Sequence, residues 1–168
     1  MDMVILEKFC TDVRFALEDA CSKRVHNESS SLHHCTFPAG CCGDTCQILS
    51  YLIFKQFRSL TLKRSGVYKP HYIQDERLRD DNSHAWLEID SFIIDLTADQ
   101  FNDRGFSNPA VMITQDDSFH KLFAKRDERF NLNQPECPRV QPTLMATTTH
   151  VCELLVSKGW DLGAVRIN

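Results

Sequence analysis

Two short apolar runs, separated by two polar residues, place the strongest constraint on what this chain can fold into. The runs occupy residues 84–89 and 92–97, and Asp90-Ser91 lies between them. Apolar runs of strand length around a two-residue polar break are typical of a β-hairpin. The pattern therefore predicts two antiparallel strands joined by a turn at Asp90-Ser91.

In this register the two faces of the hairpin differ in chemistry, because successive side chains of a strand point to opposite faces. One face is wholly apolar and carries Ala85, Leu87, Ile89, Phe92, Ile94 and Leu96. The opposite face carries Trp86 together with His84 and Asp95. His84 and Asp95 are diagonal neighbours there, about 7 Å apart at the backbone. An imidazole and a carboxylate are then within side-chain reach of each other.

A loop punctuated by Pro38 and Gly40 leads into a second informative segment. Its apolar residues follow a helical period and predict a helix over 42–57. They are Ile48, Leu49, Leu52 and Ile53. Cys42 therefore lies in the first turn, where unpaired backbone N–H groups and the helix dipole favour a thiolate. A cysteine at such a loop-to-helix junction is what a nucleophilic thiol enzyme needs.

The remaining chain predicts further helices and strands around these two segments. Apolar spacings of three and four predict a helix over 3–21, and Pro142 fits the first turn of a final helix through about Lys158. Residues 60–73 alternate weakly and predict one or two strands, and residues 111–114 a further short strand. A helical turn is expected in 118–123, and loops over 22–36, 74–83, 98–110 and 124–141. The mixture predicts an α+β fold.

Length and composition limit the classes of protein to which this chain can belong. The chain has 168 residues, of which 42% are hydrophobic and 25% charged, which suits a single domain spanning residues 1–168. The net charge of −4 argues against a nucleic-acid surface. No apolar run approaches the roughly 20 residues of a membrane span, and the first residues lack a secretion signal. We therefore expect a cytoplasmic protein without nucleic-acid or membrane partners; the oligomeric state is unknown.

The cysteine content raises a metal-binding alternative. The chain has eight cysteines, which in a reducing compartment are more often thiols than disulfides. The densest group carries enough nitrogen and sulfur for tetrahedral zinc: His33, His34, Cys35, Cys41, Cys42 and Cys46. Its spacing matches no usual C-x2-C pair, and zinc there leaves His84 and Asp95 unexplained. The principal expectation therefore includes neither a metal nor a cofactor, and zinc stays an alternative.

Cys42, His84 and Asp95 together supply the parts of a thiol catalyst. In such a site the imidazole takes the thiol proton and the carboxylate orients the imidazole. Backbone N–H groups at the helix start, including that of Cys42, would donate to a developing oxyanion. Considered alone, Cys42 could be a buried structural thiol, and His84 could be an ordinary strand histidine. The predicted proximity of His84 and Asp95 favours the catalytic interpretation.

Three segments, in this order, resemble the transglutaminase-like branch of the papain-fold enzymes. Gly40-Cys41-Cys42-Gly43-Asp44-Thr45-Cys46 is similar to the family's nucleophile motif. His84-Ala85-Trp86-Leu87-Glu88 is similar to its His-Ala-Trp-x-Glu strand. Ile94-Asp95-Leu96-Thr97 resembles its Asp-containing strand, with Leu96 where the family usually has Pro. The resemblance covers about residues 37–100 and places the nucleophile on Cys42 rather than Cys41.

The resemblance implies a papain-like (transglutaminase-like) fold, with the nucleophile helix packed on a small antiparallel sheet. It implies a thiol hydrolase or acyl transferase, protease-like or deamidase-like. Such an enzyme acts on a peptide, isopeptide or glutamine amide of a protein or peptide substrate, through a thioester at Cys42. Hydrolysis is favoured over cross-linking, because nothing in the sequence suggests a site for a second amine. The alternative is a non-catalytic or zinc-binding interaction module on the same fold.

Further residues carry secondary expectations. Asp99 and Gln100 follow the Asp95 strand closely and are expected to rim the site. His34 and Thr36 are the positional candidates for a side chain in the oxyanion hole. His120 is expected to be structural or exposed.

Overall fold

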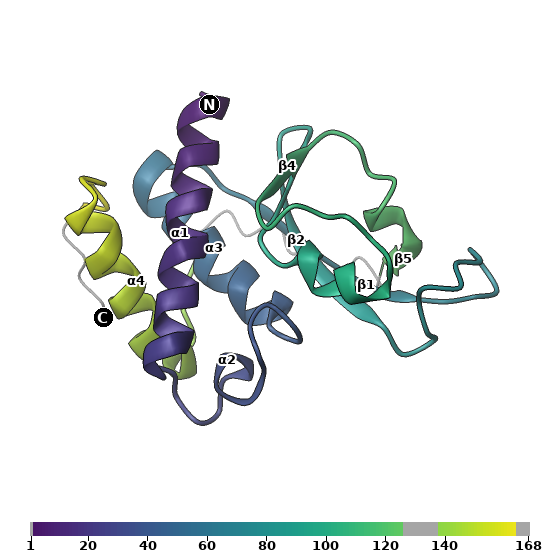
Figure 1. Cartoon of the computed structure of the whole chain (residues 1–168). Helices are drawn as coiled ribbons and strands as arrows, with labels where there is room; N and C mark the ends of the chain where they lie inside the picture. The colour runs from purple at the N-terminus through teal and green to yellow at the C-terminus, as the bar shows by residue number, and fades with distance from the viewer. Residues whose placement is uncertain (1, 126–137, 164–168) are drawn as a thin grey trace.

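A five-stranded antiparallel sheet lies beside a group of helices (Figure 1). The computed structural model describes residues 2–125 and 138–163. The strands lie in the order β4-β3-β2-β1-β5, and neighbouring strands are antiparallel. They are β1 Leu62–Tyr68, β2 Ser83–Ile89, β3 Phe92–Asp95, β4 Met112–Thr114 and β5 Phe123–Lys125. The predicted α+β class with a small antiparallel sheet is confirmed.

The helices α1, α3 and α4 lie on one side of this sheet. The α-helices are α1 Met3–Lys23, α2 Ser31–His34, α3 Cys42–Phe57 and α4 Met145–Ser157. The short 3-10 helices are η1 Ala98–Arg104, η2 His120–Leu122 and η4 Pro142–Leu144. α1 packs against α4, and α3 packs against β2. Among the helices that the structure describes, none has the length and apolarity needed to cross a bilayer.

The central hairpin has the predicted register. Leu87 pairs with Ile94, and Ile89 pairs with Phe92. The turn residue Asp90 has a φ of 52°, the left-handed conformation that a two-residue hairpin turn requires and that Asp tolerates. The prediction of a turn at Asp90-Ser91 is therefore confirmed.

Each face of the hairpin contacts its own apolar cluster. Leu87 and Ile94 pack into the main core, among residues of α1, α3 and α4. On the opposite face, Trp86 joins a second buried cluster that contains Phe101 and Phe123. The face that carries His84 is therefore covered as well, which the alternation of the hairpin alone did not indicate.

Three segments differ from their predicted structure. Ser31–His34 forms the short helix α2 within the loop expected over 22–36, and its N-cap Ser30 accepts a hydrogen bond from the Leu32 N–H. η1 occupies part of the loop expected over 98–110. β5 begins before the loop expected over 124–141, most of which lies outside the described residues. Elements of three to seven residues are too short to show a period in their apolar residues.

Arg14 joins α1 to the segment that follows β3. Its Nη1 donates to the Leu96 carbonyl at 2.6 Å, and its guanidinium binds both carboxylate oxygens of Asp99 at 2.9 Å. The side chain of Arg14 is only 9% exposed, and its guanidinium lies 4.6 Å from the centre of the Phe37 ring. One buried guanidinium thus holds the helix layer, the end of the hairpin and the loop that precedes α3.

The first prediction concerns this guanidinium. Arg14→Met keeps an unbranched apolar stem but leaves Asp99 and the Leu96 carbonyl without their donors. We expect it to lower the free energy of unfolding, measured with urea, by about 3 kcal/mol. Lys23→Met is the matched control on the same helix, because Lys23 pairs with Asp19 at the surface, where a single ion pair adds little to stability. Equal losses in both variants would contradict the anchoring role of Arg14.

Candidate active site

The loop before α3 gives the two adjacent cysteines different surroundings. Gly40 has a φ of 69°, and a Cβ there would lie 2.8 Å from the Sγ of Cys35, so glycine is required. Cys41 is fully buried, and its thiol donates to the Ala39 carbonyl at 3.2 Å. Cys42, the first residue of α3, is half-buried. Of the two thiols, only that of Cys42 is partly open to solvent.

His84 and Asp95 form a buried pair at neighbouring ends of β2 and β3. His84 Nε2 donates to Asp95 Oδ2 at 2.5 Å. The other oxygen, Oδ1, accepts from the N–H and the hydroxyl of Thr97 at 2.8 and 3.1 Å. The diagonal pairing predicted from the hairpin is confirmed. Since the Nε2–H faces the carboxylate, Nδ1 is the nitrogen left for other partners.

Cys42 completes a continuous chain of contacts. Its side chain lies close enough to His84 to contribute to the raised pKa of that imidazole, and because Nε2 is directed at Asp95, we assign that contact to Nδ1. The three residues come from α3, β2 and the end of β3. Packing of α3 against β2 brings them together. The structure thus places in contact the three side chains that the sequence analysis singled out.

Burial and mutual contact set the charges of the pair. Burial lowers the pKa of His84, but the charge and hydrogen bond of Asp95, with a smaller effect of Cys42, raise it above its usual range. Burial likewise raises the pKa of Asp95, but contacts with His84 and His120 outweigh it and hold the pKa well below the usual range. Asp95 is therefore a carboxylate at neutral pH, and it favours a proton on the imidazole.

His120 is a second imidazole at this carboxylate. It lies in η2, is buried, and its Nε2 donates to the same Oδ2 of Asp95 at 2.9 Å. Within the part of the chain that the structure describes, its Nδ1 is buried without a hydrogen-bond partner. From the sequence, His120 is expected to be structural or exposed, and its contact with Asp95 is not predicted. Phe119 and Phe123, which flank it, were the signal that the segment enters the core.

Gln100 connects the cysteine loop to the imidazole. Its Oε1 accepts from the Gly40 N–H at 3.1 Å, and its Nε2 lies 3.2 Å from Nδ1 of His84. Gln100 therefore borders the site, as predicted. Asp99 does not, because its carboxylate pairs with Arg14. His34, a positional candidate for the oxyanion hole, is exposed and lies edge-to-face against the ring of His33; Thr36, the other, is exposed too.

The same residues have the spacing of a metal site. Donor atoms of His84, Asp95 and His120 lie within 4.8 Å of one another, and imidazole and carboxylate bind zinc and other transition metals. Among the residues that the structure describes, no group of three from the cysteine-rich segment 33–46 meets this spacing. Direct hydrogen bonds of 2.5 and 2.9 Å join the three side chains.

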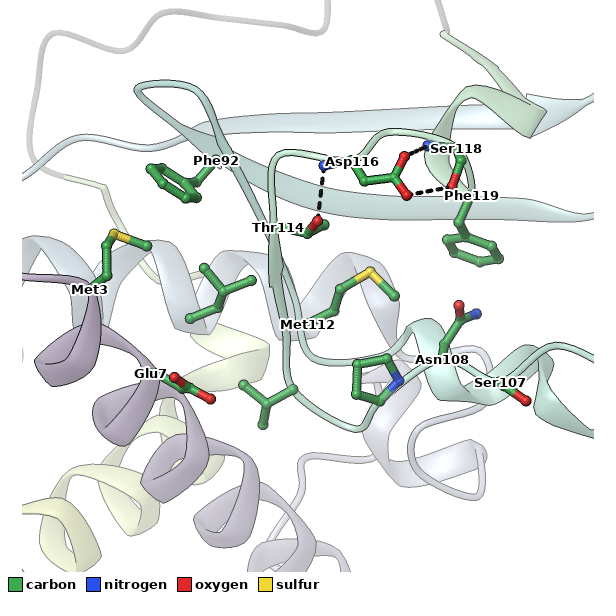
Figure 2. Close-up of a pocket in the computed structure, with 13 residues that line it drawn as sticks. Met3, Glu7, Phe92, Ser107, Asn108, Met112, Thr114, Asp116, Ser118 and Phe119 are labelled. Carbon is green, nitrogen blue, oxygen red and sulfur yellow. Dashed lines mark hydrogen bonds between the residues drawn. The ribbon is translucent and has the colours of Figure 1, made fainter.

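A separate pocket of about 500 Å³ lies between the first turns of α1 and strand β4 (Figure 2). Met3, Phe92 and Met112 supply apolar walls, and Glu7 and Asp116 supply carboxylates. None of the three residues of the candidate site lines this pocket. We therefore assign it no part in the chemistry of Cys42.

The site stands on its own geometry. No family model, curated protein or solved structure matches this chain. The chemistry open to this site therefore follows from the contacts of Cys42, His84 and Asp95.

The second prediction tests the buried pair through pH. His84, with its raised pKa, stabilises the fold below its unfolded pKa of about 6.5, and this contribution is lost as pH rises through the folded value. Asp95, with its lowered pKa, stabilises the fold above its unfolded pKa of about 3.9. This contribution is lost as pH falls through the folded value. Both stabilising contributions are therefore fully present between about pH 4 and 6.5.

We therefore expect Asp95→Asn to lower the free energy of unfolding most within that window and less at alkaline pH. Urea denaturation of wild type and variant across the pH range measures the difference. Asp103→Asn is the control, because Asp103 is exposed and its carboxylate faces the guanidinium of Arg104. A loss in Asp95→Asn that is the same at every pH would refute the coupling.

Proposed function

We propose that this protein is a thiol hydrolase or acyl transferase with a papain-like, transglutaminase-like fold, acting through a thioester at Cys42. The observation that carries the proposal is the unbroken contact from the Cys42 thiol through His84 to the Asp95 carboxylate. Activation of a thiol by an imidazole, itself oriented by a carboxylate, is the general requirement of such catalysis.

The reaction would proceed in two stages on a peptide, isopeptide or glutamine side-chain amide. The sulfur of Cys42 bonds to the carbonyl carbon while its proton passes to Nδ1 of His84, and Asp95 stabilises the imidazolium. His84 then gives that proton to the leaving nitrogen as the carbon–nitrogen bond breaks, which leaves a thioester. Water, deprotonated by the same imidazole, attacks the thioester and releases the acid and the Cys42 thiol.

The start of α3 supports the same chemistry. The first N–H groups of a helix have no partner within the helix, and they carry its positive dipole end. Those next to Cys42 would donate to the oxygen that becomes negative when the thiol attacks. Hydrolysis is favoured over transfer to an amine, because nothing in the sequence suggests a site for a second amine substrate.

The third prediction concerns thiol reactivity. Burial raises the pKa of Cys10 to about 12 and of Cys152 to about 11, and raises that of Cys41 further. Iodoacetamide near neutral pH should therefore modify the partly exposed Cys42 well before these thiols. Peptide mass spectrometry of briefly labelled protein measures the order. The label should disappear in Cys42→Ala and persist in Cys41→Ala.

The same two variants test turnover. Glutamine peptides scored for ammonia release, and isopeptide-linked peptides scored for cleavage, are the substrates. Removal of the nucleophile should lower kcat/KM at least about a thousandfold, while Cys41→Ala retains activity. Turnover that survives in Cys42→Ala would overturn the proposed mechanism.

Metal binding is the second candidate function, favoured by the grouping of His84, Asp95 and His120. As the fourth prediction, protein purified without added metal should contain far less than one equivalent, because direct hydrogen bonds already join these side chains. Elemental analysis measures the content. One equivalent of zinc that is lost in His120→Gln would favour a metal-binding module over the enzyme.

A further inference from the structure

The outer edge of strand β4 lies open to the pocket of Figure 2. β4 pairs with β3 on one side, and it is the last strand of the sheet among the residues that the structure describes. Met112 packs on the second cluster and Ile113 on the main core, so these neighbours point to opposite faces. Both residues line the pocket of about 500 Å³. The pocket therefore runs along the edge of β4 and not over one of its faces.

An open edge offers backbone hydrogen-bonding groups to a further strand. The N–H and C=O groups on the outer side of β4 have no partner strand within the described part of the chain. Such edges accept an extended peptide as an additional strand. Proteins often block them with a lysine or a proline in the edge strand, and Met112–Thr114 contains neither. Backbone pairing at β4 is thus available to a peptide in the extended conformation.

The walls of the pocket determine which side chains such a strand would carry. On the side of α1, Met3 and Phe92 supply apolar surface and Glu7 supplies a carboxylate. On the other side, Met112 and Phe119 supply apolar surface. Side chains of an added strand alternate between the two sides. A lysine or arginine that faces α1 would cover Met3 with its apolar stem and bring its charge to Glu7, and its two neighbours would be apolar.

The pocket carries negative charge without a cation of its own. Asp116 follows β4 and is the second carboxylate; it accepts hydrogen bonds from the N–H and the hydroxyl of Ser118. Of the described residues that line the pocket, none is a lysine, an arginine or a histidine. The Glu7 carboxylate forms no ion pair or hydrogen bond with the described residues. A basic side chain of a partner is therefore favoured at Glu7.

A second copy of the chain fits this edge less well than a basic peptide does. Pairing of β4 with β4 of another molecule would bring the Glu7 and Asp116 carboxylates of both copies into one groove. Like charges placed together at an interface are unfavourable. β4 itself, with the sequence Met-Ile-Thr, supplies no cation to offset them.

We propose that the edge of β4 is a peptide-binding site that takes an extended segment of a partner protein as an additional strand, and that Glu7 selects a lysine or arginine flanked by apolar residues. Main-chain hydrogen bonds give affinity in this mode of binding, and pockets for alternate side chains give specificity. The inference goes beyond the proposed function and does not depend on it, since none of Cys42, His84 and Asp95 lines the pocket.

The fifth prediction concerns the carboxylate of Glu7. The probes are a fluorescein-labelled peptide, Ser-Thr-Val-Lys-Val-Thr-Ser, and its analogue with uncharged norleucine in place of lysine. Fluorescence anisotropy with the full chain measures both dissociation constants. Glu7→Gln should weaken binding of the lysine peptide about fivefold and leave binding of the norleucine peptide unchanged. Glu153→Gln is the matched control, because Glu153 is exposed on α4 and does not line the pocket; it should change neither constant.

Two results would overturn the role of Glu7. One is the absence of saturable binding of the lysine peptide to the wild-type chain. The other is a Glu7→Gln variant that weakens both peptides equally, since the carboxylate would then not be reading the charge.

N-methylation of the lysine peptide tests whether it binds as a strand. Successive residues of a strand direct their N–H groups to opposite sides. Methylation of every second amide should therefore weaken binding at least about tenfold, and methylation of the amides between them should have little effect. Equal losses at all positions would contradict strand addition. A wild-type dimer, seen by sedimentation and dissociated by the peptide, would assign the edge to a second copy and overturn the proposal.

Discussion

A single buried carboxylate holds together the segments that make up both the fold and the candidate site. Asp95 is 1% exposed, and an isolated charge in that position would be very costly. Four hydrogen bonds offset the cost: two from imidazoles to one oxygen, and two from Thr97 to the other. The imidazoles come from β2 and η2, so satisfying this charge determines how η2 docks on the hairpin. The groups that would perform catalysis are therefore also structural groups.

Aromatic rings then exclude water from the polar face of the hairpin. The His84 ring lies 5.3 Å from that of Phe101 and 5.4 Å from that of Phe123, between centroids. Electrostatic interactions strengthen when water is removed, which is why the contact of Asp95 with His84 outweighs the burial of both. Cys42 approaches from α3 and is the only one of the three side chains that keeps partial exposure. The arrangement leaves the Cys42 thiol partly open to solvent and the pair of His84 and Asp95 buried.

Local spacing explains which features could be predicted from the sequence. The hairpin register, the start of α3 and the pairing of His84 with Asp95 depend on residues close together in the chain, where strand and helix geometry determine contact. η1 and the docking of His120 depend on tertiary packing of short segments without a period. The burial of the second hairpin face depends on those same segments, so alternation within β2 and β3 could not reveal it.

Cys42 and His84 are not independent, although they lie on different elements. Gly40 is crowded by Cys35 and needs a positive φ, which sets the path of the chain into Cys42. The same residue directs its N–H at Gln100 and thereby orients the amide that faces His84.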